Sequence, residues 1–282
     1  MFAPSIAALS LLQAALIGLP AGGSPKLVAP ALSRWWALIM PASIVVVIGG
    51  IALAPSVADG LTYLALVGVP VLAALALATF VRGARPQFAL AVLPLFAVAW
   101  AARGNLAGEA AAYALTALAC VTLGSLLVAL VPRRWVRAGI YAMACVDVVF
   151  VSANLLQQPN SVLNHAAPAA GLPQLQYVLL GSAVMGFGDL FIAATLGALL
   201  AREGRRVSPA VGLAACFGLA FDLLFIVVSE LPTTVPIALT LAVIDRRRLR
   251  SSACGPSATT SPSPHSPLRP PGSEPTPARW SG

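Results

Sequence analysis

Three aspartates of this 282-residue chain lie inside long apolar runs, where a carboxyl group is unexpected. Asp147 lies in "YAMACVDVVFVS", Asp189 in "MGFGDLFIAA" and Asp222 in "CFGLAFDLLF". A charged side chain at the centre of a bilayer costs about 2.5–3.5 kcal/mol or more, so acids in such places are functional candidates by default. Two carboxyl groups that face one another hold one proton between them. Such a pair can hold a water molecule and act on a carbonyl as general base and general acid.

The composition around these acids is typical of a membrane protein. The chain is 59% hydrophobic and 9% charged, with a mean hydropathy of +0.90, whereas soluble domains carry about 25% charged residues. The apolar runs predict an all-α, polytopic membrane protein with about nine transmembrane helices. The predicted spans cover residues 3–20, 35–54, 61–81, 87–102, 109–131, 136–157, 175–201, 208–229 and 231–245.

These spans define a transmembrane domain over residues 1–250, and the composition changes after it. Residues 251–282 are rich in proline and serine and lack an apolar period, which predicts a disordered cytoplasmic tail. The last predicted span contains Pro232 and Pro236, so we expect it to be partly irregular.

The positions of the basic residues predict an orientation. With nine spans, fourteen of them fall on one side of the membrane and only Arg103 falls on the other. The fourteen are Lys26, Arg34, Arg82, Arg85, Arg133, Arg134, Arg137, Arg202, Arg205, Arg206, Arg246, Arg247, Arg248 and Arg250. The positive-inside rule then predicts a multi-pass protein of the cell membrane with its N-terminus outside and its C-terminus in the cytoplasm. Because these residues flank apolar runs, the net charge of +8 does not indicate a nucleic-acid partner.

This orientation places two of the aspartates at similar depth. Asp147 follows Arg137 by ten residues, or about 15 Å of helix, and Asp189 precedes Arg202 by thirteen, or about 20 Å. The two spans are consecutive and antiparallel, so the carboxyl groups can meet if the spans are neighbours. Asp222 is left without a partner, and we expect either a neutral hydrogen-bonded acid or a group that tunes the pair.

No cofactor is expected from the sequence. Three of the four cysteines lie in apolar runs and one lies in the tail, without the paired spacing of a disulfide or metal site. Both histidines, His165 and His265, lie in loop-like sequence. We therefore predict neither a metal site nor an organic cofactor.

Several of these features together resemble the presenilin and signal peptide peptidase family of GxGD intramembrane aspartyl proteases. They are the nine spans, the aspartate in the sixth span, "GFGD" in the seventh and "PIAL" in the ninth. The resemblance implies that Asp147 and Asp189 form a catalytic pair. It also implies that a substrate peptide is bound with the help of Gly186, Gly188, Pro236, Ala238 and Leu239.

Two motifs differ from the family pattern, which indicates a diverged member. Val146 stands where the family usually has tyrosine before the first aspartate, and Ile237 interrupts the Pro-Ala-Leu motif. The expected activity is hydrolysis of peptide bonds within transmembrane or signal-peptide segments, with the lipid bilayer and a transmembrane peptide as partners. Two alternatives stay open, a proton-coupled small-molecule transporter and a catalytically inactive family member.

Overall fold

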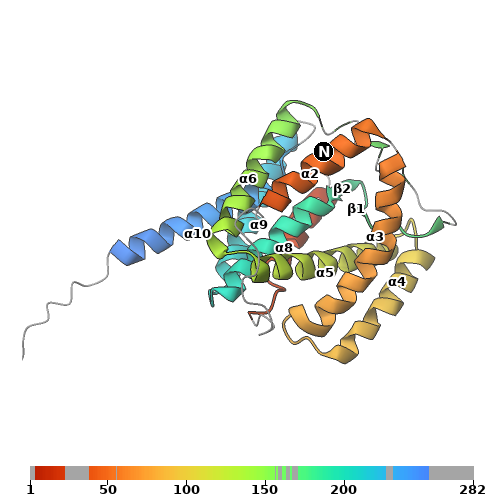
Figure 1. Ribbon diagram of the computed structural model, residues 1–282, viewed down its shortest axis with the longest axis horizontal. Coiled ribbons are helices and arrows are strands. Elements are labelled where there is room, and N and C mark those ends of the chain that lie inside the picture. The colour runs from red at the N-terminus through yellow and green to blue at the C-terminus, as the bar shows by residue number, and fades with distance from the viewer. Residues whose placement is uncertain are drawn as a thin grey trace, which may run out of the picture.

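The computed structural model describes residues 4–22, 38–54, 56–155, 157, 161–162, 166, 171–226 and 231–253, and the described chain is mostly helical, as predicted (Figure 1). Its α-helices are α1 (Pro4–Leu16), α2 (Ile39–Leu53), α3 (Ser56–Leu75), α4 (Val92–Ala101), α5 (Leu106–Leu130), α6 (Arg133–Ser152), α8 (Phe187–Arg202), α9 (Ser208–Asp222) and α10 (Val235–Ala253). Shorter elements are the π-helix η2 (Ala76–Phe80), the 3-10 helices η3 (Pro86–Ala91) and η5 (Leu223–Ile226), and the strands β1 (Tyr177–Leu180) and β2 (Ala183–Gly186).

The predicted count of nine spans is not confirmed. Each predicted span contains a helix, but only three helical segments among the described residues are long and apolar enough to cross a bilayer: Ser56–Phe80, α5 and α6. Four further apolar helices are shorter than this. The 16 residues of α8 would extend about 24 Å, whereas a hydrocarbon core is about 30 Å thick.

The prediction of one continuous helix over residues 175–201 is wrong. The first part of that segment is an antiparallel hairpin, in which Val178 pairs with Met185 and Leu179 pairs with Val184. Burial alternates along the strands, since Val178 and Met185 are buried while Leu179 and Val184 are exposed. Gly181, at φ +61°, forms the tight turn that a residue with a side chain seldom adopts. Helix α8 therefore begins at Phe187, directly after the hairpin.

Helix α8 is the central element of the fold. It is buried along almost its whole length and contacts α1, α5, α6 and α10. The closest approach to α5 is at Gly124, where an added Cβ would lie 2.8 Å from the backbone nitrogen of Thr195. By contrast, α3 and α4 lie side by side at the edge of the molecule, away from α10, and expose apolar side chains such as Val67 and Leu93 (Figure 1).

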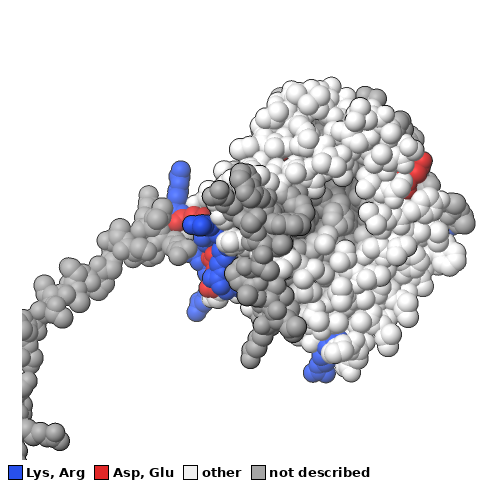
Figure 2. Space-filling view, in the orientation of Figure 1, with Lys and Arg blue, Asp and Glu red and all other residues white. Residues whose placement is uncertain are grey.

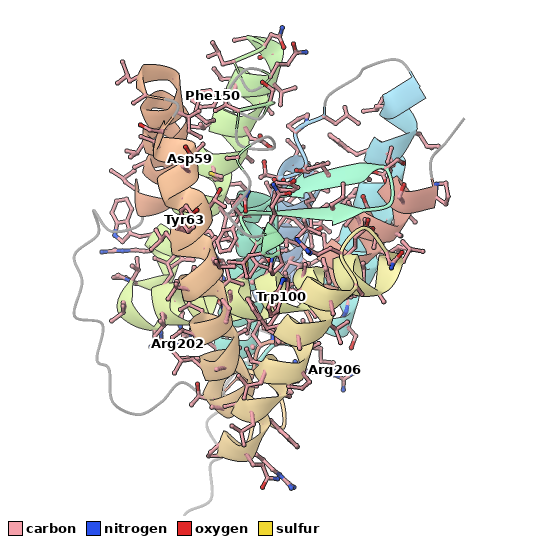
Figure 3. All side chains as sticks on the ribbon, turned by 90° about the vertical axis from the view of Figure 1, so that its right-hand side faces the viewer. Asp59, Tyr63, Trp100, Phe150, Arg202 and Arg206 are labelled. Atoms are coloured by element: carbon pink, nitrogen blue, oxygen red, sulfur yellow. The ribbon has the colours of Figure 1, made fainter. Side chains whose placement is uncertain are left out.

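An ion cluster joins the start of α6 and the end of α8 to the middle of α10. Arg137 near the start of α6 contacts Glu203, just after α8, at 2.7 Å, and its Nε lies 3.5 Å from Asp245 of α10. Helices α6 and α8 therefore run antiparallel. Figure 2 shows charged side chains gathered near the base of α10 on an otherwise largely uncharged face. Figure 3 shows Asp59 and Phe150 towards one end of the molecule, with Arg202 and Arg206 farther down.

The prediction that the last span is partly irregular is confirmed for residues 231–234, but Pro236 itself does not interrupt the helix. Pro236 lies in the first turn of α10, where the missing N–H removes no helical hydrogen bond, and the helix continues to Ala253. The irregular backbone lies before the helix, at Leu231–Thr234. Three residues of the predicted tail are thus helical, while residues 254–282 and Lys26, Arg34, His165 and His265 lie outside the described residues.

Candidate active site

Asp147 lies in the second half of α6, with only 6% of its surface exposed. Its Oδ2 accepts two hydrogen bonds from Thr234, from the hydroxyl at 2.6 Å and from the backbone N–H at 3.3 Å. Thr234 can offer both donors because it lies in the non-helical residues that precede α10. This carboxyl group is therefore held from one side by a single residue that is 87 positions away in the sequence.

Asp189 lies in the first turn of α8 and is half-buried. Its Oδ2 accepts a hydrogen bond from the backbone N–H of Gly186 at 3.1 Å, as a carboxylate at this position of a helix often does. The side chain of Thr233 lies close enough to this carboxyl group to favour its charged form. The positive end of the α8 dipole also favours a negative charge here.

The structure brings the two predicted acids together. Asp147 and Asp189 are close enough to interact electrostatically. Thr234 donates two hydrogen bonds to Asp147, and the preceding residue, Thr233, lies beside Asp189. The segment Leu231–Thr234 thus faces both carboxyl groups. One aspartate comes from the middle of a helical bundle and the other from the point where β2 turns into α8.

Gln13 belongs to the same site, although its position in the sequence did not point to it. This α1 side chain is 4% exposed, and its Nε2 donates to the carbonyl oxygens of Asp189 at 3.1 Å and Thr233 at 3.5 Å. It therefore connects the first turn of α8 with the residues before α10. The available signal was a lone amide in an otherwise apolar segment, "SLLQAALI".

Apolar and weakly polar groups form the remaining walls near Asp189. Cys120 of α5 is fully buried, and its thiol lies 3.8 Å from the carbonyl oxygen of Phe187. Met143 of α6 lies beside Gly188, where an added Cβ would be 3.4 Å from its Cε. These contacts limit the access of water to the carboxyl groups from the sides of α5 and α6.

The remaining predicted site residues differ in how close they lie to the two acids. Gly186 and Gly188 flank Asp189 directly, and Pro236 and Ala238 are buried at the start of α10, shortly after Thr234. Leu239 is 39% exposed, so its side chain lies at the surface of α10 rather than in the core. Asp222 has a different partner, Ser10 of α1.

The described residues contain no group of three or more histidine, cysteine or acidic side chains arranged for a metal ion. Cys120, Cys145 and Cys216 are free thiols. The sequence matches no protein-family model, no curated protein and no solved structure.

Proposed function

We propose that this protein is an intramembrane aspartyl protease that hydrolyses peptide bonds within transmembrane or signal-peptide segments. The observation that carries this proposal is the convergence of Asp147 and Asp189 at Thr233 and Thr234. A buried and a half-buried carboxyl group at close range, each with a hydroxyl or backbone N–H donor, form an arrangement that can activate water toward an amide carbonyl.

The pair acts through one shared proton. The ionised carboxylate takes a proton from a water molecule, whose oxygen attacks the amide carbon, while the protonated acid gives its proton to the carbonyl oxygen. The tetrahedral intermediate then collapses: the carboxyl group that took the proton from water gives it to the leaving nitrogen and the C–N bond breaks, while the other carboxylate takes a proton from one hydroxyl of the intermediate, which restores the shared proton. Thr234 holds Asp147 through its hydroxyl and backbone N–H, and the backbone N–H of Gly186 holds Asp189, so each carboxyl group keeps a donor while it is charged.

The hairpin before α8 supports a peptide substrate in extended form. Peptide carbonyls within a helix are already hydrogen-bonded, so a transmembrane substrate must unwind before a water molecule can attack it. β2 pairs with β1 along one edge only, and no strand of the described residues pairs with its other edge. A peptide added at that edge gains backbone hydrogen bonds and lies close to Asp189, three residues after the end of β2.

The lengths of three helices and the apolar side chains exposed on the surface support a location in a membrane. Ser56–Phe80, α5 and α6 meet the requirements for spanning helices, and α3 and α4 expose apolar side chains that suit lipid. Arg137 near the start of α6 and Arg205 after the end of α8 share Glu203, and Figure 2 shows Lys and Arg side chains gathered beside α10. This gathering of basic residues supports an outside N-terminus and a cytoplasmic C-terminus in the cell membrane.

The direct test is cleavage of a synthetic transmembrane peptide by purified protein in proteoliposomes. The wild-type protein is expected to release products that mass spectrometry can assign to a cut inside the apolar segment. Asp189→Ala is expected to release none, while it elutes as a folded species in detergent. Equal cleavage by the two proteins would sink the proposal, because the activity would then belong to a contaminant or to another site.

A proton-coupled transporter is the second candidate, and one observation favours it. The Oδ2 atom of Asp222 is buried and has no hydrogen-bond partner among the described residues, as expected of a group that takes up a proton or cation. Substrate uptake into proteoliposomes that depends on Asp222 more than on Asp147 would favour transport over proteolysis.

A further inference from the structure

Asp222, the acid that the proposed mechanism does not use, makes one specific contact. It ends α9 with 5% of its surface exposed, and its Oδ1 accepts a hydrogen bond of 2.9 Å from the hydroxyl of Ser10 on α1. Gly218, one turn earlier on α9, permits this approach, since an added Cβ there would lie 3.3 Å from the Cβ of Ser10. The contact therefore fixes α1 against α9 at one level.

The same face of α1 also reaches the candidate active site. Ser10 and Gln13 are three residues apart, so their side chains lie on one face, separated by about 4.5 Å along the axis. Gln13 donates to the carbonyl oxygens of Asp189 and Thr233. A shift of α1 along α9 would move the Gln13 amide by the same amount, and these two hydrogen bonds would lengthen together.

We propose that Asp222 is a positioning residue for the Asp147–Asp189 pair, a role that rests on the proposed function. Its hydrogen bond to Ser10 sets the register of α1, and Gln13 then holds the first turn of α8 next to Thr233. Thr234, the residue after Thr233, donates two hydrogen bonds to Asp147. A fixed distance between the first turn of α8 and Thr233 therefore fixes Asp189 relative to Asp147.

This role requires a hydrogen-bond acceptor at position 222 and does not require a titratable group. Asparagine offers an oxygen to Ser10 in the same place, whereas alanine offers none. A transporter that loads a proton on Asp222 would lose function with either substitution. The pair Asp222→Asn and Asp222→Ala therefore separates positioning from proton transport.

The first test is the kinetics of cleavage of the model peptide. Asp222→Asn is expected to keep kcat within about threefold, whereas Asp222→Ala and Ser10→Ala each lower kcat by about tenfold with little change in KM. The double variant Ser10→Ala, Asp222→Ala should be no slower than Asp222→Ala alone, because both changes remove the same contact. Multiplied losses in the double variant, or an Asp222→Asn as slow as Asp222→Ala, would overturn the proposal.

The second test needs no proteolytic activity. In a background with the four cysteines changed to alanine, Thr233→Cys introduces a thiol whose alkylation by N-ethylmaleimide can be timed. Asp222→Ala is expected to raise the alkylation rate at least about threefold, because the segment that contains residue 233 opens more often when α1 no longer holds it. Asp222→Asn is expected to leave the rate unchanged. An unchanged rate in Asp222→Ala would overturn the positioning role, whether or not the wild-type protein cleaves peptides.

An engineered disulfide between α1 and α9 can replace the lost contact between Ser10 and Asp222. The Cβ separation of 3.3 Å between Ser10 and a residue at Gly218 is near the usual disulfide range of about 3.5–4.5 Å. In the same background, Ser10→Cys with Gly218→Cys is expected to form a bond on oxidation and to reverse the effects of Asp222→Ala on alkylation and on kcat. Failure of the bond to form, or complete bonding without rescue, would contradict the proposed link between α1 and α9.

Discussion

The Asp147–Asp189 pair and Asp222 are carboxyl groups from apolar runs that lie in very different surroundings. Asp147 and Asp189 receive hydrogen bonds from residues outside regular helices: Thr234 before α10, and Gly186 at the end of β2. Asp222 receives one hydrogen bond from a hydroxyl on a continuous helix, α1. Irregular backbone offers free N–H groups and leaves room for a substrate, whereas two packed helices offer neither. This difference supports the proposals that the pair carries out the chemistry and that Asp222 positions it.

The largest expected loss of peptide cleavage comes from replacing one carboxyl group of the pair with an amide. Asp147→Asn keeps the size of the side chain and an acceptor for Thr234, but it cannot exchange a proton with water. We expect peptide cleavage to fall by about 10³-fold or more, because general acid–base catalysis contributes about 10²–10⁴-fold and the variant also loses the shared proton. Initial rates measured by mass spectrometry at saturating peptide would report this loss.

The matched control for Asp147→Asn is the same substitution at the other site. Asp222→Asn also removes one carboxyl group from a buried position, so it corrects for effects of the change on insertion and folding. Similar losses in the two variants would erase the proposed distinction between the sites.

The sequence predicted the acids of the site better than it predicted their surroundings. Arginine positions gave the antiparallel relation of the spans that contain Asp147 and Asp189, because charge at span ends reports topology directly. Gln13, Thr233 and Thr234 were missed, since a contact between residues more than 80 positions apart leaves no local pattern. The hairpin was missed because an apolar run of ten residues fits a strand pair and a buried helix equally well.

The fold was predictable in class but not in detail. Apolar runs identified where helices lie, and each predicted span does contain one. Helix lengths were overestimated where the chain breaks, as at Gly186 before α8 and at Leu231–Thr234 before α10. These breaks depend on contacts with other segments, which supply partners for backbone groups that would otherwise be unsatisfied.

The second largest effect is expected at Thr234, which holds Asp147. Thr234→Val removes the hydroxyl donor but keeps the shape and the backbone N–H, so Asp147 retains one of its two hydrogen bonds. Hydrogen bonds to charged groups contribute about 1.5–3 kcal/mol, and we expect kcat/KM to fall by about tenfold or somewhat more. Thr234→Ser should restore most of this loss.

Thr240 provides the control for Thr234→Val. It is also buried in α10, but its hydroxyl bonds only to the carbonyl oxygen of Pro236 in the same helix. Thr240→Val should therefore leave kcat/KM within about twofold of the wild-type value. Equal losses at both positions would mean that the threonines act through the packing of α10 and not through Asp147.

A smaller effect is expected from the two glycines before Asp189, and the structure ranks them. A Cβ at Gly186 would lie 3.2 Å from Asp189 Oδ2, so Gly186→Ala displaces the carboxyl group itself. At Gly188 the added atom would meet only the flexible end of Met143 at 3.4 Å. We expect about a fivefold loss of cleavage for Gly186→Ala and less than about twofold for Gly188→Ala. The reverse order would contradict the geometry of the α8 N-terminus.

The smallest effect on cleavage is expected from the ion cluster at the other end of α6. Arg137 contacts Glu203 through both carboxylate oxygens, and Arg137→Gln leaves Glu203 partly buried with only Arg205 beside it. We expect the unfolding midpoint in detergent to fall by several degrees, for a loss of about 1–2 kcal/mol. Arg134→Gln, which removes an exposed charge from the same end of α6, should change stability by less than about 0.5 kcal/mol.

Cleavage at a temperature where both variants remain folded should stay within about twofold of wild type, because Arg137 lies ten residues, or about 15 Å of helix, from Asp147. A loss of kcat in fully folded Arg137→Gln would show that the cluster and the acid pair are coupled along α6, so that the ends of the helices also set the geometry of the site.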